Sequence, residues 1–448
     1  MKIPKASPDI SSLIHHINPE NLKAFAQAKV GPVVGDAYLH WDQLRHREPP
    51  PGLNLESWWL GIKLARQANF QVLPLLDKEQ RSFVFGTPEP MQIHLHHIDQ
   101  DAAGTLRSET EGPTAAHKDE YLLRSLVEES ITSSQLEGAS TTRRVAEAML
   151  REGRKPKDHG ERMIYNNFIA MRAVQDMRGE AINVDRILDL HRRVTEGMLE
   201  DPADAGRLRR SDDIRVVNID DGTILHQPPK ASELKERLER LCAFANAPET
   251  SRPFVHPLLR AILLHFMIGY DHPFSDGNGR TARALFYWSM LRSGYWLSEF
   301  ISISNVLKKA PAQYGLAYLY TETDGGDTTY FLLHQLETVC KAIDALRDYL
   351  NRKTEERRSV DKLLAPTTEL GERLNHRQRA LLAHALRHPD AVYTIAGHRG
   401  LHAIVYQTAR TDLIALAEAN LLQQERRGRG FVFTVPEDLG GKIKGFRR

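Results

Sequence analysis

The stretch His272–Arg283, with the sequence HPFSDGNGRTAR, decides the fold around it because it interrupts a helical pattern. Residues 257–270 have apolar side chains at helical spacing, and residues 282–295 resume the same period. The interruption holds two glycines, an asparagine and an aspartate, residue types that favour turns and helix caps. The sequence therefore predicts two helices joined by a tight loop.

The loop has the composition of an anion-binding site. Residues 277–279 (GNG) can turn successive backbone N–H groups toward one point at the start of the second helix, where the helix dipole also favours negative charge. Arg280 and Arg283 are three residues apart, so they share one face of the first turn. Such a loop suits a polyphosphate, with His272 and Asp276 beside it.

The same twelve residues match the pattern HxFx(D/E)GNGRxxR at every specified position, and the chain therefore resembles the Fic family. The resemblance implies transfer of a nucleoside monophosphate, usually AMP from ATP, to a protein hydroxyl with release of pyrophosphate. It implies that His272 is the catalytic general base and that Asp276 holds Mg²⁺. The nucleotide-binding residues that it implies are Asp276, Gly277, Asn278, Gly279, Arg280, Thr281, Arg283 and Tyr314.

Two of these positions carry further expectations. In the kinase-like Doc branch a lysine replaces the second glycine of GNGR and the nucleotide binds reversed, so Gly279 favours nucleotidyl over phosphoryl transfer. Tyr314 is expected against the adenine, because an aromatic face suits a purine ring. The alternative for Tyr314 is an ordinary core position.

A second motif lies upstream, at the end of a predicted helix over residues 120–138. Residues 133–138 (SSQLEG) match the family's inhibitory pattern (S/T)xxxE(G/N), which implies roles for Ser133, Glu137 and Gly138. The resemblance implies that Glu137 pairs with Arg283 and occupies the position of the γ-phosphate. The alternative is a solvent-facing carboxylate near a helix end.

Residues 214–229 differ from their helical surroundings and predict a β-hairpin. Residues 214–220 are β-rich, and Asp221-Gly222 is a hairpin turn signal. The segment resembles the family's flap, whose strand edge could align a target peptide by main-chain pairing. The predicted flap residues are Thr223, Ile224, Leu225 and His226. A purely structural hairpin is the alternative. His191, among apolar neighbours, is interpreted as a structural histidine.

The N-terminal part, residues 1–110, predicts an α+β accessory domain. Residues 56–70 fit an amphipathic helix, and residues 81–87 and 91–99 alternate as short strands do. The histidines at 94, 96 and 97 have no ligand partners at metal-site spacing, which favours surface or strand positions. Residues 102–119 are small and polar, as linkers are.

The C-terminal part, residues 372–448, predicts a helix, a helix–turn–helix and a basic hairpin, the order of a winged-helix domain. It carries 13 Lys and Arg against 7 Asp and Glu, a net +6, whereas the rest of the chain is at −4. Both features favour DNA as a partner, and a docking or dimerisation module or a solvated basic end is the alternative. The side chains expected on DNA are Arg399, His402, Tyr406, Gln407, Arg410, Arg426, Arg427 and Arg429.

Composition sets the remaining limits. With 448 residues, 41% hydrophobic and 26% charged, the chain predicts a globular protein of several domains. No apolar run approaches the roughly 18 residues that span a bilayer, and the cysteines, Cys242 and Cys340, are expected as buried thiols in a reducing cytosol. The expected location is therefore cytoplasmic, with no membrane partner.

The predicted fold class is mainly α: a helical Fic core with a small β-hairpin flap, flanked by the accessory region and the winged-helix domain. The predicted domains are 1–110, 111–350 (the Fic domain with its inhibitory helix), 351–371 (a linker) and 372–448. The predicted function is an autoinhibited protein adenylyltransferase that uses ATP and Mg²⁺ on a target protein, with a homodimer as a candidate assembly. The alternatives are a transferase with another nucleotide donor and a DNA-binding regulator whose Fic core senses nucleotide.

Overall fold

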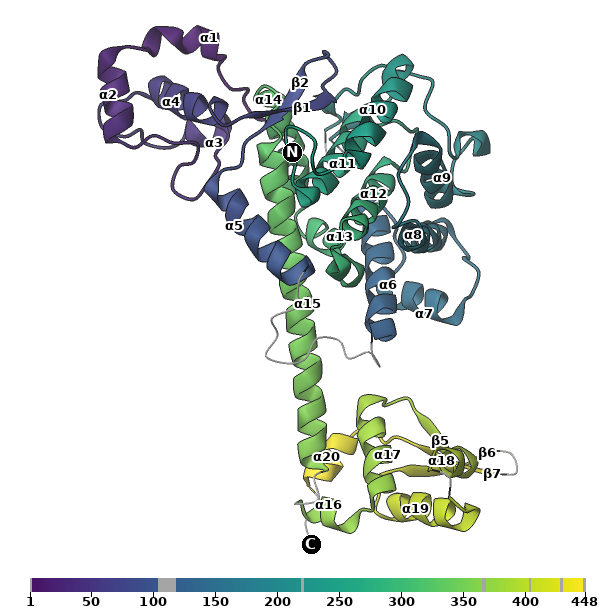
Figure 1. The fold of residues 1–448 in the computed structure, drawn as a ribbon. Coiled ribbons are helices and arrows are strands. Elements are labelled where there is room, and N and C mark those ends of the chain that lie inside the picture. The colour runs from purple at the N-terminus through teal and green to yellow at the C-terminus, as the bar shows by residue number, and fades with distance from the viewer. Residues whose placement is uncertain are drawn as a thin grey trace. The chain divides into compact units, whose positions relative to one another are not determined.

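The computed structural model describes residues 2–103, 118–218, 221–364, 368–402, 404–427 and 430–445. The chain is mainly helical, as predicted, and divides into two compact units, Met1–Leu346 and Arg347–Arg448 (Figure 1). Most of the predicted linker at residues 102–119 lies outside the described residues. Among the described helices, none is long and apolar enough to cross a membrane.

The first unit begins with short helices and one hairpin. Their bounds are α1 (Ile10–Leu13), α2 (Pro19–Gln27), α3 (Trp41–Leu44), α4 (Leu55–Gln67), β1 (Gln71–Leu76), β2 (Ser82–Phe85) and α5 (Glu89–Ile98). The amphipathic helix predicted at 56–70 is α4, which Asn54 caps and which buries Trp58 and Trp59. The antiparallel pairing of β1 with β2 includes the strand predicted at 81–87.

The strand predicted at residues 91–99 is wrong, because this segment belongs to helix α5. Its buried residues, Met91 and Ile98, are seven apart, which is two helical turns. Pro90 stands in the first turn, where a missing N–H costs nothing. His94 lies near Cys340, with 3.5 Å between its Nδ1 and the sulfur atom. No cluster of three metal-ligating side chains occurs among the described residues, His94, His96 and His97 included.

The rest of the first unit is a bundle of helices (Figure 1), of which the last extends beyond residue 346, and a second small hairpin. The bounds are α6 (Lys118–Leu136), α7 (Arg143–Glu152), α8 (His159–Asp176), α9 (Val184–Thr195), β3 (Val216–Val217), β4 (Ile224–His226), α10 (Leu234–Asn246), α11 (Pro257–Asp271), α12 (Asn278–Arg292), α13 (Ile303–Leu307), α14 (Pro311–Thr323) and α15 (Thr329–Leu363). The hairpin β3–β4 lies where the sequence predicts the flap.

Helices α11 and α12 pack against each other, and α8 and α9 pack on α12. Helix α11 is apolar on nearly every face and is buried accordingly. Helix α12 is also buried, although it carries Arg280 and Arg283, whose side chains are 0% and 2% exposed. Guanidinium groups are rarely buried without partners, so these two arginines mark α12 as the chemically unusual element of the core.

Buried charges join the N-terminal segment to this core. Lys63 on α4 pairs with Asp324 at 2.9 Å, and Arg66 donates a hydrogen bond of 2.7 Å to the Tyr330 hydroxyl. Arg237 on α10 pairs with Asp271 at 2.7 Å and also donates to the carbonyl oxygens of Leu76 and Asp77. The N-terminal segment and the bundle therefore belong to one compact unit, and the finer division at residue 110 stays a prediction.

The second unit has its own core, which includes Leu382, Leu413 and Phe433. Its elements are α16 (Glu369–Arg373), α17 (His376–Arg387), β5 (Val392–Thr394), α18 (Ile395–His402), α19 (Tyr406–Glu418), β6 (Gln423–Arg427), β7 (Gly430–Thr434) and α20 (Leu439–Lys444). The three strands form a sheet in the order β5-β7-β6. This arrangement is compatible with the winged-helix interpretation, which stays a prediction, as do the linker and domain bounds. Arg429 lies outside the described residues.

Candidate active site

The loop between α11 and α12 is held in an unusual backbone conformation. His272 ends α11 in the left-handed region with φ 43°, and Gly277 begins α12 with φ 79°. A positive φ is uncommon for a residue with a side chain and is maintained only where the surroundings enforce it. At Gly277 a Cβ atom would come within 2.6 Å of Thr195, so glycine is required there for space as well as for φ.

His272 has the geometry of a general base. Its Nδ1 donates a hydrogen bond of 2.6 Å to the carbonyl oxygen of Gly269, which leaves the lone pair of neutral imidazole on Nε2. Burial lowers the pKa of His272 below its ordinary value, and the hydrogen bond to Gly269 opposes this only in part. The imidazole is therefore neutral near pH 7 and can accept a proton at Nε2.

Arg209 is a positioning residue that no sequence motif predicted. Its Nε donates to the His272 carbonyl oxygen at 2.8 Å, and its backbone N–H donates to the Pro273 carbonyl oxygen at 2.9 Å. The same guanidinium donates to the carbonyl oxygen of Pro229, which follows the flap. One buried cation therefore fixes the strained backbone at His272 and connects it to the flap. Arg209 lies in a loop, where no helical or strand periodicity in the sequence could have indicated its role.

His191 supports the loop from α9, as the structural interpretation predicted. Its Nε2 donates to the carbonyl oxygen of Asp276 at 2.9 Å, its Nδ1 accepts from the N–H of Gly206 at 2.9 Å, and its ring stacks on Phe274 with centroids 3.7 Å apart. Burial lowers the pKa of His191 to about 4, so this ring stays neutral. Both ring nitrogens are used in holding the loop.

The predicted nucleotide-binding residues separate into two groups. Gly279, Arg283 and Tyr314 line a cavity of about 300 Å³ together with His272 and Glu137. The members that do not line this cavity are Asp276, Gly277, Asn278, Arg280 and Thr281. The side chains of this second group are mostly engaged in building the loop.

Three of these side chains have identified partners within the fold. The Asn278 side chain accepts a hydrogen bond from the N–H of Phe274 at 3.0 Å and donates one to the Phe274 carbonyl oxygen at 2.9 Å, so it connects the two ends of the loop. Thr281 donates to the carbonyl oxygen of Gly277 at 2.9 Å. Arg280 donates to the carbonyl oxygen of Val194 at 2.6 Å, and its Nε and Nη2 have no hydrogen-bond partner.

Asp276 is the residue to which the sequence assigns Mg²⁺. Its side chain is 55% exposed, one of its oxygens accepts from the N–H of Gly277 at 2.6 Å, and the other lies 3.5 Å from Arg280. A single carboxylate fits Mg²⁺ in the manner of kinase and ATPase sites, where substrate phosphates and water complete the coordination. Asp276 is thus chemically suited to a shared site, and Mg²⁺ binding there stays a prediction.

Glu137 lies beside Arg283 across the fold. The carboxylate accepts a hydrogen bond of 2.8 Å from Arg283 Nη2 and is 27% exposed. Burial would raise the pKa of Glu137, but the charge and hydrogen bond of Arg283 outweigh it and hold the pKa below its usual value. Arg283 also donates to the hydroxyl of Ser133 at 2.8 Å and to its carbonyl oxygen at 3.1 Å. Gly138 follows with φ 94° and ends the helix.

The Glu137 carboxylate occupies the place that an anion would take. A Cβ atom on Gly279 would lie only 2.1 Å from Glu137 Oε1, so the carboxylate sits directly on the first turn of α12. Free backbone N–H groups and the helix dipole attract negative charge to that turn. Glu137 and a bound phosphate would therefore compete for the same space and the same arginine.

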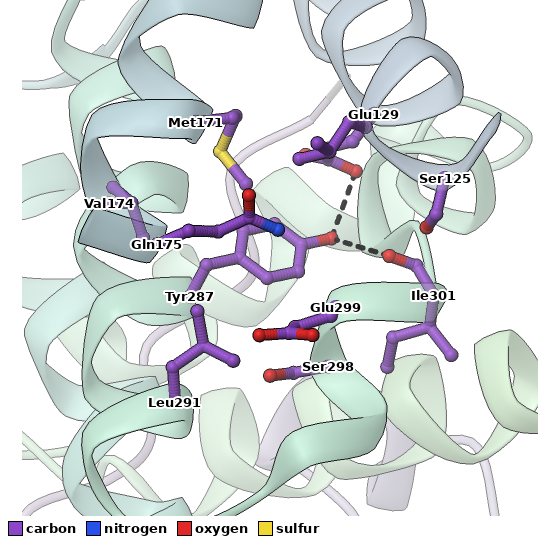
Figure 2. Close-up of a pocket in the computed structure, with 11 residues that line it drawn as sticks. Ser125, Glu129, Met171, Val174, Gln175, Tyr287, Leu291, Ser298, Glu299 and Ile301 are labelled. Carbon is purple, nitrogen blue, oxygen red and sulfur yellow. Dashed lines mark hydrogen bonds between the residues drawn. The ribbon is translucent and has the colours of Figure 1, made fainter. Parts of the chain in front are cut away.

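Helix α6, which carries Ser133 near its end, is anchored by a second carboxylate that the sequence motifs did not identify. Glu129 is 2% exposed and accepts hydrogen bonds from the Tyr287 hydroxyl at 3.0 Å, from the Ser302 hydroxyl at 2.7 Å and from the N–H of Ser304 at 3.1 Å. Figure 2 shows Glu129 and Tyr287 joined, with the Tyr287 hydroxyl also bonded to the carbonyl oxygen of Ile301. Burial raises the pKa of Glu129. The sequence signal that could have identified Glu129 is the presence of an acidic residue on the apolar side of the predicted helix.

The flap covers one side of the cavity with two of its four predicted residues. Leu225 and His226 line the cavity together with Val216, whereas Thr223 and Ile224 are exposed. His226 Nε2 donates to the carbonyl oxygen of Tyr270 at 2.7 Å, and its Nδ1 is 2.8 Å from the Glu322 carboxylate. These bonds fix the end of β4 over the catalytic loop.

Comparisons with known proteins agree with this site. Residues 181–290 match the model of the Fic/DOC family. Proteins named protein adenylyltransferase Fic from Drosophila yakuba and Drosophila erecta are 27% and 28% identical over 251 and 253 residues, which is 54% of this chain and 48% of each relative. The chain spans about half the length of the curated relatives it matches.

A solved structure shares the fold. The Fic family protein from Desulfovibrio desulfuricans G20 is 16% identical, has a TM-score of 0.50, and matches over 78% of this chain and 97% of its own. At that identity the likeness concerns the fold alone. The family match and the named relatives agree on one assignment, with which the shared fold is consistent: residues 181–290 of this chain are a Fic/DOC family domain.

Proposed function

We propose that this chain is an autoinhibited protein adenylyltransferase, which transfers AMP from ATP to a serine, threonine or tyrosine hydroxyl of a target protein. The observation that carries the proposal is the cavity in which the free Nε2 of His272 faces the same space as Gly279 and Arg283. A base, a helix N-terminus and a buried cation are what transfer at a phosphate requires. The relatives' names support the adenylyl group as the group transferred.

The reaction follows from the residues that face the cavity. The target hydroxyl oxygen attacks the α-phosphorus in line, and His272 Nε2 takes the hydroxyl proton. The bond from the α-phosphorus to its bridging oxygen breaks, and pyrophosphate leaves. The backbone N–H groups at the start of α12 and the Arg283 guanidinium neutralise the phosphate charge. Mg²⁺, if held by Asp276, would supply further neutralisation of the phosphates.

The decisive experiment is incubation of the full-length protein with labelled ATP and Mg²⁺ in the presence of a protein lysate. An adenylyltransferase labels protein, itself included, and the label contains the α-phosphate. A chain that only senses nucleotide binds ATP without labelling any protein. Parallel reactions with labelled GTP and UTP decide the donor, because the loop residues contact phosphates and carry no information about the base.

The proton-transfer role predicts the pH dependence of transfer. Burial lowers the pKa of His272 below 6.5, and only the neutral ring is a base, so kcat/KM should rise with pH along an acid limb centred below pH 6.5. The Glu137 charge raises this pKa, so its removal should move the acid limb to lower pH still. Measuring kcat/KM from pH 5 to 8 for Glu137→Gly tests this. An acid limb centred above pH 6.5 would contradict it.

Glu129 should control the same reaction from a distance. Glu129→Gln replaces an acceptor in a buried network by a donor, which costs about 1–3 kcal/mol and loosens the end of α6. Autolabelling should therefore rise about fivefold or more, and no further rise should follow in a Glu137→Gly background. Glu128→Gln is the matched control, because Glu128 lies next to it on α6 and pairs with Arg143 instead. Equal effects of the two substitutions would argue against an anchoring role.

A second candidate partner, duplex DNA, is proposed for the second unit. Arg426 and Arg427 are exposed on β6, an edge strand of the sheet, and Tyr406 and Arg410 are exposed on α19. We expect the full-length chain to bind duplex DNA with a steep salt dependence, and the double change Arg426→Gln, Arg427→Gln to reduce the salt slope by about 2. Gel-shift titrations measure both. Absence of binding at low salt would favour a docking or dimerisation module.

A further inference from the structure

A second cavity, of about 460 Å³, lies against helix α14. It shares no lining residue with the cavity around His272 and Arg283, which is called the nucleotide cavity below. Tyr314 and Tyr318 line the nucleotide cavity, whereas Leu316 and Tyr320 line the second one. The remaining walls come from α3 and the segment before it, from α5 and from the start of α15, all within the first unit. The volume is in the range of small-molecule sites, and nothing in the proposed transfer reaction uses it.

Three tyrosine rings form one wall of this second cavity. Tyr330 contacts Tyr38 edge to face with centroids 5.1 Å apart, and it contacts Tyr320 at 5.7 Å. His40 stacks on Tyr320 from behind at 4.6 Å. The face of an aromatic ring carries negative quadrupole density, which attracts a cation placed over it.

Two of the three rings, those of Tyr38 and Tyr330, are held in place because their hydroxyl groups are bonded to buried carboxylates. The Tyr38 hydroxyl donates to Asp327 at 2.6 Å, and the Tyr330 hydroxyl donates to Asp324 at 2.8 Å. These two aspartates are balanced by Lys63 and Arg66, and Arg66 covers one face of Tyr38 at 3.5 Å. These two rings are therefore fixed before any ligand arrives, which reduces the entropy cost of binding.

The charged side chains that line the second cavity are of one sign, whereas Lys63 and Arg66 lie behind the tyrosine wall in pairs with buried carboxylates. Asp36 and Glu337 are exposed carboxylates in its lining, and the described lining residues include no lysine or arginine. Glu337 pairs with Lys341 at 2.7 Å, but both side chains are more than half exposed, so water screens this pair. The two lining histidines add no positive charge near pH 7, because burial lowers the pKa of His94 and lowers that of His334 to about 4. A phosphate ligand would find no cation here.

We propose that this cavity is a second ligand site, which takes an organic cation: a protonated amine carried on an apolar or aromatic body. The tyrosine wall would hold the apolar body and attract the ammonium group, and Asp36 and Glu337 would supply the opposite charge. The site is distinct from the nucleotide cavity by its residues and by its electrostatic sign. It stands independently of whether the chain transfers AMP.

Calorimetric titration of the full-length protein with three probes of one shape tests the proposal. The probes are 4-phenylbutylamine, 4-phenylbutanol and 4-phenylbutyrate, which are cationic, neutral and anionic at pH 7. The amine should bind about tenfold more tightly than the alcohol, and the carboxylate should bind most weakly. Equal affinities, or tighter binding of the carboxylate, would overturn the proposal.

Paired variants locate the bound amine. Glu337→Gln should weaken amine binding about threefold and leave alcohol binding unchanged, whereas Glu236→Gln should change neither. Glu236 is a matched control because it is also exposed and pairs with a cation four residues on, Arg240.

Tyr320→Ala should weaken amine binding about tenfold, whereas Tyr318→Ala, which alters the nucleotide cavity from the same helix, should not. A stronger effect of Tyr318→Ala would place the amine in the nucleotide cavity and overturn the proposal.

Discussion

His272→Ala abolishes transfer while ATP binding stays close to that of the unchanged chain: this is the expected result with the largest effect. General base catalysis contributes about 10²–10⁴-fold, and among the described residues that line the cavity His272 has the free nitrogen suited to the task. In the proposed mechanism the phosphates bind to the start of α12 and to Arg283, which this substitution leaves in place. The loss should therefore fall on kcat and not on the nucleotide dissociation constant.

The backbone at His272 requires a second variant. Alanine disfavours the left-handed conformation that His272 adopts at φ 43°, so a loss of activity could reflect a displaced loop. Asparagine tolerates that conformation and has no basic nitrogen, so His272→Asn should lose transfer to the same extent. Initial autolabelling rates and ATP calorimetry for both variants decide the matter. Transfer by His272→Asn at the rate of the unchanged chain would rule out the base.

Glu137→Gly is expected to raise autolabelling about 100-fold, the largest gain that the structure predicts. The carboxylate lies on the first turn of α12 and is bonded to Arg283, so under the proposed function it takes the space and the cation that the γ-phosphate would use. A misalignment of about 1 Å at the α-phosphorus can cost on the order of 100-fold in rate. Removing Glu137 leaves Arg283 in position, because the hydroxyl and carbonyl oxygen of Ser133 still hold it.

A double-variant cycle shows whether the gain passes through this one pair. Arg283→Ala should lower transfer, and Glu137→Gly combined with it should give no gain, because both effects depend on the same guanidinium. Glu137→Gln is the informative control, since it keeps the volume above Gly279 and removes the charge. Its rate should fall between those of the unchanged chain and Glu137→Gly. An unchanged rate for Glu137→Gly would mean that Glu137 is an ordinary carboxylate at a helix end.

Residues 272–283 were interpretable from sequence because their signals are local. Turn-forming residues between two helical periods predicted the loop, and the structure confirms α11 and α12 on either side of it. The helix that carries the SSQLEG motif and the hairpin at 214–229 were predicted for the same reason. Caps, turns and helical periods depend on residues a few positions apart, and a single sequence records those directly.

Which side chains share the cavity was decided by tertiary packing. The motif treats Asn278, Arg280 and Arg283 alike, yet Asn278 closes the loop, Arg280 is buried beside Asp276, and only Arg283 lines the cavity with Glu137. The same limit explains the error at residues 91–99, where alternating histidines resembled a strand. Only the burial of Met91 and Ile98 against other elements makes that segment the helix α5.

The sequence by itself determined the loop, its flanking helices and the family resemblance, all of which follow from nearest neighbours along the chain. The resemblance also implied the pairing of Glu137 with Arg283, which the structure shows at 2.8 Å across 146 positions. The tertiary structure alone decided that Glu129 anchors α6 to residues 158 to 175 positions away, and that Arg209 holds the His272 carbonyl oxygen. Such contacts form because buried charges must find partners wherever the fold brings them close. No local pattern along the chain encodes which partner that is.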